Sequence, residues 1–153
     1  MIDDLLALAD RLAKASPRRP RQADIRRSIS TAYYALFHAL ARNGADLLVG
    51  TTKAYRSEKA WQQMYRALDH GRAKSASEAS RNLGFPQDLK DCADAFVELQ
   101  KARHDADYDP LHRPSRQDAL QAAARARDAI SKLRGAPIKH RRAFAVQLLM
   151  QKR

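Results

Sequence analysis

Hydrophobic residues recur along most of the chain at the three- and four-residue spacing of amphipathic helices, and no stretch of useful length alternates like a strand. The spacing predicts helices over residues 2–13, 22–42, 54–69, 86–105 and 115–134. Asn43-Gly44 either ends the second helix or kinks it, and the Gly-, Ser-, Lys- and Arg-rich residues 70–84 are predicted to form a loop. Residues 1–135 are therefore expected to form an all-α, up-and-down bundle of four to five helices, followed by a basic C-terminal helical tail over residues 136–153.

Composition is consistent with one folded domain. The 153 residues are 44% hydrophobic and 30% charged, and no apolar run approaches the roughly 20 residues that span a bilayer. The opening M-I-D-D-L-L carries acids where a secretion signal carries bases, and the single cysteine, Cys92, has no partner for a disulfide or a metal framework. A reducing cytoplasm is the expected compartment, with no membrane partner.

The net charge of +12 favours binding to a polyanion such as RNA. Residues 11–27 hold seven Lys and Arg against one acid, and residues 136–153 hold five against none. Residues 86–109 reverse this balance, with seven acids against three bases. An arginine-rich surface without a specific ligand explains the same charge, so both interpretations remain open.

The second predicted helix carries a polar face distinct from its hydrophobic stripe. Arg27, Ser30, Tyr34 and His38 are separated by three, four and four residues, which places them on one side of the helix. These side chains either line a functional cleft or make ordinary hydrogen bonds within a helix buried on two sides.

Arg103 continues the hydrophobic stripe of the fourth predicted helix, which is formed by Phe85, Leu89, Cys92, Phe96 and Leu99. Its side chain is therefore expected to point toward the core and to need a partner, because an unpaired buried charge is very costly. Asp107, four residues later, is the nearest candidate partner. Arg103 either closes the helix end as a salt bridge with Asp107 or binds an anion such as phosphate.

Other kinds of site have no support in the sequence. Asp105-x-Asp107-x-Asp109 begins like a calcium loop, but Pro110 stands where that loop needs glycine and Arg116 where it needs glutamate. No phosphate-binding glycine loop, dinucleotide fingerprint or zinc-hydrolase motif is present, so no metal and no cofactor are expected. For the tail, packing against the bundle or a second subunit is favoured over contact with RNA or a membrane surface.

Two motifs together resemble the HEPN domain superfamily. The string R-R-S-I-S-T-A-Y-Y-A-L-F-H at 26–38 is followed, about 65 residues later, by R-H-D-A-D-Y-D-P at 103–110. Both are similar to motifs of the small prokaryotic branch that carries an A-Y-Y-A-x-F-H helix and an R-x-x-A-D-Y motif. The resemblance covers residues 2–134.

The resemblance implies a helical homodimer whose two R-x4–6-H motifs meet in a shared cleft. Many members are metal-independent endoribonucleases, often toxins paired with a small nucleotidyltransferase antitoxin, and others are non-catalytic modules that bind RNA, nucleotides or a partner. Carried over to this chain, Arg103 matches the motif arginine and Tyr108 falls where the motif histidine stands. Ser30, Tyr34 and His38 would lie on the helix that lines the same cleft.

Tyr108 is a departure that affects the expected chemistry. RNA cleavage without a metal needs an arginine to stabilise the phosphorane and a group that transfers protons. Histidine, with a pKa of about 6.5, suits proton transfer at neutral pH, whereas tyrosine, with a pKa of about 10, does not. His104 or His38 is the alternative proton carrier. The sequence thus leaves two functions open: an endoribonuclease, or a non-catalytic RNA-, nucleotide- or partner-binding module.

Overall fold

A computed structural model describes residues 1–150 of the chain, which form seven α-helices and no strand. The helices are α1 (Ile2–Lys14), α2 (Gln22–Leu48), α3 (Glu58–Arg66), α4 (His70–Ser80), α5 (Gln87–Tyr108), α6 (Arg116–Gly135) and α7 (Ile138–Leu149). The all-α prediction is confirmed, whereas four to five helices was too few. No helix within residues 1–150 is long and apolar enough to cross a membrane.

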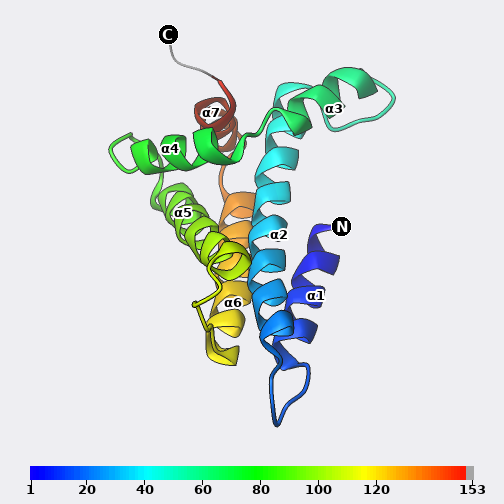
Figure 1. The fold of residues 1–153 in the computed structure, drawn as a ribbon. Helices are drawn as coiled ribbons and strands as arrows, with labels where there is room; N and C mark the ends of the chain where they lie inside the picture. Colours follow the sequence, from blue (N-terminus) through cyan, green and yellow to red (C-terminus); the bar gives the residue numbers. More distant parts are fainter. Residues whose placement is uncertain (151–153) are drawn as a thin grey trace.

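The four long helices α1, α2, α5 and α6 run alternately up and down, and α3, α4 and α7 gather at the end of the bundle where α2 ends (Figure 1). α2 is the central element, since it packs against α1, α3, α5, α6 and α7. Small residues on α2 let its neighbours approach closely. The residues concerned are fully or almost fully buried: Ser28, Ala32, Ala35, Ala39 and Ala41.

The start of α6 follows directly from the sequence. The Ser115 side chain accepts a hydrogen bond from the Asp118 amide, and the Asp118 carboxylate accepts one from the Ser115 amide, which completes a capping box. The alanine-rich face of α6 then lies in the core, and its buried residues are Ala119, Ala122, Ala123, Ala126, Ala129, Ile130 and Leu133.

The second helix continues past Asn43-Gly44 to Leu48, so the interpretation of these residues as a helix end was wrong, and an extension beyond them is what the structure has. Gly44 faces α7, where a methyl group added to it would overlap the side chain of Leu149. The Asn43 amide donates to the carbonyl of Arg141 at 3.3 Å, and the Arg141 guanidinium donates to the Asn43 carbonyl at 3.1 Å. These two residues therefore mark the docking of α7 on α2 rather than a helix stop.

Residues 70–80 form helix α4, where the sequence predicted a loop. The Asp69 side chain accepts from the Arg72 amide and caps the helix, and Ala73, Ser77 and Ser80 are buried on its inner side, which packs against α5 and α7. Burial against α5 and α7 thus stabilises a helix that contains several serines and Gly71, whose helix propensity is weaker than that of its alanines. The third helix begins at Glu58 after the Ser57 cap, not at residue 54, and α5 extends to Tyr108.

α7 packs against α2 and α4. Its Phe144 is fully buried and meets Phe85 edge to face at a centroid distance of 5.5 Å. The predicted preference of this segment for packing on the bundle therefore agrees with the structure, whereas its separation from residues 1–135 as a distinct unit stays a prediction.

Replacement of Phe144 by alanine should lower the free energy of unfolding by about 3–5 kcal/mol, because it leaves a cavity between α7 and the bundle. Urea titration followed by circular dichroism measures this change. The matched control is Val146→Ala on the same helix, where the side chain is 42% exposed and little should change. Equal losses in the two variants would show that α7 contributes no core packing.

Candidate functional site

Arg103 lies on α5 against the second, polar face of α2. Its side chain is only 12% exposed, and its guanidinium carbon lies 5.0 Å from the ring centre of Tyr33 and 5.9 Å from that of Tyr34. This inward position agrees with the place of Arg103 on the hydrophobic stripe. The two aromatic rings attract the cation by their negative faces.

The donors of Arg103 are poorly satisfied. The contact with Asp107, from Nη1 to Oδ2, is long at 3.9 Å, and the buried Nε has no hydrogen-bond partner within residues 1–150. The buried Oε1 of Gln100, one turn earlier, also lacks a partner there. Both residues line a pocket of about 250 Å³, completed by Lys74, Lys101 and His104. The basic side chains of the pocket are suited to bind an anionic ligand, whereas the Gln100 oxygen is an acceptor and needs a donor group.

Asp107 joins this site to the polar face of α2. The Ser30 hydroxyl donates to the Asp107 carboxylate at 3.2 Å, across the contact between α2 and α5. The predicted residues Ser30, Tyr34, Arg103 and Asp107 are therefore close together in the structure.

His70, at the start of α4, adds a group that the sequence did not indicate. Its Nδ1 is hydrogen-bonded to the Tyr33 hydroxyl, and its ring stacks on Phe37 at a centroid distance of 4.2 Å. Burial raises the pKa of Tyr33, while burial and then the charge of Arg103 lower the pKa of His70, so both stay neutral near pH 7. His70 was not among the predicted site residues, because residues 70–84 were predicted to form a loop. Asp69, a good N-cap residue directly before His70, indicates the start of a helix there.

His38 lies one turn further along α2 than Tyr34, and its Nδ1 is 2.7 Å from the Tyr65 hydroxyl of α3. Burial lowers the pKa of His38 and raises that of Tyr65. The His38 ring is also 6.3 Å from that of Tyr34. His38 therefore continues the row of aromatic rings beyond Tyr34, further along α2 and away from Arg103. Its Nδ1 is already engaged in a hydrogen bond.

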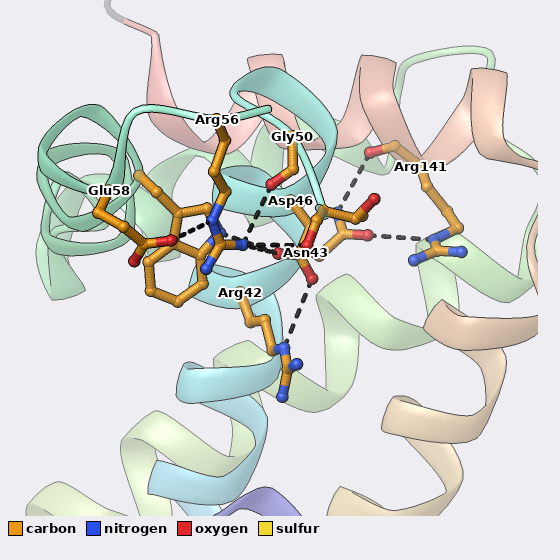
Figure 2. Close-up of polar contacts among 9 residues, drawn as sticks. Arg42, Asn43, Asp46, Gly50, Arg56, Glu58 and Arg141 are labelled. Atoms are coloured by element: carbon orange, nitrogen blue, oxygen red, sulfur yellow. Dashed lines mark hydrogen bonds and ion pairs between the residues drawn. The ribbon is translucent and has the colours of Figure 1, made fainter. Parts of the chain in front are cut away.

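A network around Arg56 places α3 and hence Tyr65 (Figure 2). Arg56 pairs with Glu58 at 2.8 Å and with Asp46 at 3.5 Å, and it donates to the carbonyl of Gly50 at 3.2 Å. Its guanidinium also covers the ring of Trp61, whose indole N–H donates to Asp46 at 2.9 Å. These contacts fix the loop between α2 and α3.

Arg26, rather than Arg27, shapes the end of α5. It donates to the carbonyls of Ala106 at 2.8 Å and Asp109 at 2.9 Å, and also to that of His112. A cation at the C-terminus of a helix satisfies carbonyls that have no partner within the helix. Arg27 is exposed on the surface. The spacing of polar residues along the helix could not show which of the adjacent residues Arg26 and Arg27 contacts the end of α5.

The remaining candidates lie on the solvent side of α5. His104 and Tyr108 are both exposed, with ring centres 5.1 Å apart, and Tyr108 is 66% exposed. His104 lines the pocket beside Arg103, whereas Tyr108 does not. The predicted site residues thus separate into an inner group around Arg103 and an exposed pair, His104 and Tyr108.

The acids of α5 do not form a metal site. No group of three or more His, Cys, Asp or Glu residues within residues 1–150 is arranged to hold a metal ion. Basic side chains neutralise most of this acidic segment: Lys132 pairs with Asp91, Arg81 with Asp94, Arg125 with Glu98 and Lys101 with Asp105. The carboxylate of this stretch that opposes an anion at Arg103 is therefore chiefly Asp107, which lies 3.9 Å from the guanidinium.

Comparison with known proteins finds no match, neither to a family model nor to a curated protein nor to a solved structure.

The two half-buried histidines, His38 and His70, predict a pH dependence of stability. Because their pKa values are lower in the folded chain than in the unfolded one, stability is fully present above about pH 6.5 and falls as the pH drops through the folded-state values. Once protonated, His70 would be repelled by the positive charge of Arg103. Among the charged groups that shift the pKa of His70, only Asp69 favours the protonated form. Urea unfolding between pH 7.5 and 5.0 tests this, above the range in which carboxylates titrate.

The His70→Gln variant should show a weaker dependence over the same range, while His104→Gln, at an exposed position, should behave like the wild type. An unchanged slope in His70→Gln would mean that His70 does not contribute to the pH effect.

Proposed function

We propose that this protein is an RNA-interacting protein of the HEPN type in which Arg103 binds a phosphate group of RNA. The observation that carries the proposal is the state of Arg103: a cation only 12% exposed, with a buried, unpartnered Nε and a long 3.9 Å contact to its nearest carboxylate. A plain salt bridge would use those donors. A guanidinium with free donors is suited to bind a phosphate by two parallel hydrogen bonds.

The surroundings of Arg103 support the same function. Lys74 and Lys101 line the pocket with it, so an incoming phosphate meets the charges of Arg103 and Lys74 and that of Lys101, which is shared with Asp105 at 2.7 Å. Asp107, the carboxylate that faces the guanidinium, is shared with the Ser30 hydroxyl. The net charge of +12 adds long-range attraction for a polyanion.

Metal-independent cleavage of RNA is the more specific form of the proposal. Arg103 then stabilises the phosphorane, and His104, which lines the same pocket, is the candidate for proton transfer. Tyr108 is less suited, because a phenol with an ordinary pKa of about 10 is a weak base at neutral pH. His38 is hydrogen-bonded to Tyr65 and takes no part. Without cleavage, the same pocket makes the chain a non-catalytic RNA- or nucleotide-binding module.

RNA binding tests the role of Arg103. Arg103→Ala should weaken the binding of a single-stranded RNA by about tenfold or more, since hydrogen bonds to charged groups contribute about 1.5–3 kcal/mol. Asp107→Asn should strengthen binding, because the phosphate no longer competes with a carboxylate. Fluorescence anisotropy with a labelled RNA, at several salt concentrations, measures both changes.

Lys90→Ala is the matched control, since it removes one positive charge from α5 outside the pocket. If Arg103–Asp107 is only a structural pair, both variants lose stability and neither changes RNA binding. Cleavage is assayed in EDTA with detection of 2′,3′-cyclic phosphate ends, and it should disappear in Arg103→Ala and fall in His104→Gln. Equal cleavage by the wild type and Arg103→Ala would exclude catalysis at this site.

A homodimer that brings two copies of the Arg103 pocket together is part of the proposal. Two large hydrophobic side chains are exposed at the end of α5 and in the loop that follows it, Tyr108 at 66% and Leu111 at 86%. A second copy that covers them would bury apolar surface and would bring basic residues across the acidic side of α5. A small nucleotidyltransferase antitoxin is the partner that the HEPN resemblance suggests.

Leu111→Asp should convert the proposed dimer to a monomer, because it places a charge in the centre of the apolar contact. Analytical ultracentrifugation over a range of concentrations measures the change. Val146→Asp on α7, 42% exposed and distant in sequence from this face, controls for the added charge. A wild type that sediments as a monomer at all concentrations would remove this part of the proposal.

A further inference from the structure

Three arginines from three different helices line a second, separate hollow of about 150 Å³ near the C-terminal end of α2. They are Arg42 of α2, Arg134 of α6 and Arg141 of α7. The hollow shares no residue with the pocket around Arg103. Figure 2 shows Arg42 and Arg141 on either side of Asn43, with Asp46 one turn further along α2.

The carboxylates in this region do not balance the arginines. Asp46 pairs with Arg42 at 3.4 Å, but it also accepts the Trp61 indole N–H and pairs with Arg56. The remaining nearby acid, Asp3, is 81% exposed and makes a loose contact of 3.4 Å with Arg134. Such an exposed pair contributes little stability and is screened by salt. The hollow therefore keeps an excess of positive charge.

Arg141 is held in place rather than free to turn away. Its Nε and its backbone carbonyl both bond to the Asn43 side chain, which leaves the two terminal nitrogens without a bond inside residues 1–150. Asn43 and Asp46 also line the hollow, and the rest of its wall is apolar and buried: Ile2, Ala39 and Leu133. An apolar wall lowers the local dielectric constant and so strengthens the attraction between an arginine and an anion.

We propose that the hollow between Arg42, Arg134 and Arg141 binds a phosphate group. Arginine donors from several directions suit the tetrahedral arrangement of phosphate oxygens, and the volume admits a small anion but not a nucleotide base with its sugar. The phosphate belongs to a small free ligand or to RNA. Because the residues differ from those at Arg103, this site does not depend on the function proposed for Arg103.

The single tryptophan of the chain is a natural probe for this site. Its indole N–H is bonded to Asp46, the same carboxylate that pairs with Arg42, so an anion that draws Arg42 away changes the environment of that proton. Titration of the full chain with inorganic phosphate, followed by the indole cross-peak in an NMR spectrum, should give a saturable shift. Sodium chloride at matched ionic strength should not.

Arg134→Gln and Arg141→Gln should each weaken phosphate binding by about tenfold or more. Arg127→Gln is the matched control: it lies on α6 too, is 50% exposed against 52% for Arg134, and pairs with Asp10 outside the hollow. It should bind like the wild type. Arg134 is surface-exposed, so that variant keeps the test valid even if Arg141→Gln fails to fold. Equal affinity in Arg134→Gln and wild type, or an equal shift with chloride, would overturn the proposal.

A second set of titrations identifies the source of the phosphate. A shift with both a 5′-phosphorylated RNA and its 5′-hydroxyl counterpart assigns the hollow to backbone phosphates, and a shift with the phosphorylated RNA alone assigns it to an RNA end. A shift with inorganic phosphate and with neither RNA assigns it to a small free ligand. No shift with any of the three probes would overturn the proposal. The Arg103→Ala variant should retain the response, which separates this site from the one at Arg103.

Discussion

The structure depends on the burial of α2 on almost all sides. Five helices pack against this one element, so its polar side chains must find partners within the protein. Tyr33 meets His70, His38 meets Tyr65, and Ser30 meets Asp107. α3 and α5 are held in turn by the contacts they make with α2, whereas α4, which supplies His70, packs against α5 and α7. At the candidate site α5 brings polar groups against α2, those of Arg103 and Gln100, that are not fully satisfied within residues 1–150.

Local patterns predicted the long helices well, because their hydrophobic spacing and the capping box of α6 need no tertiary contact to be recognised. They failed where tertiary packing decides. α4 is built from Gly, Ser, Ala and Arg residues whose helix is stabilised by burial against α5 and α7. Gly44 resembles a helix stop in the sequence but serves a close contact between helices. The inward position of Arg103 was predictable from its stripe, whereas its aromatic support and the approach of His70 required the fold.

The charges of the chain are divided by function rather than spread evenly. Four acids of α5 are neutralised by nearby Lys and Arg residues, so the acidic segment contributes little negative field. Arg103 and Arg141, by contrast, keep donors without a partner inside residues 1–150, and they lie at two separate places on the bundle. Arg26 shows a third use, in which a cation satisfies helix carbonyls and has no role toward a ligand. The number of basic residues in the sequence does not show which of them neutralise acids, which keep unused donors and which bond to helix carbonyls.

The contact at Gly44 has a consequence for comparing this chain with its relatives. A methyl group at this position would meet the end of the flexible Leu149 side chain, so a substitution at Gly44 requires Leu149 to change its rotamer and does not by itself displace α7. In homologous sequences the residues at these two positions should therefore vary together, with a larger residue at one matched by a smaller residue at the other. The contact between Asn43 and Arg141 beside them can then be kept, and with it the hollow that Arg141 lines.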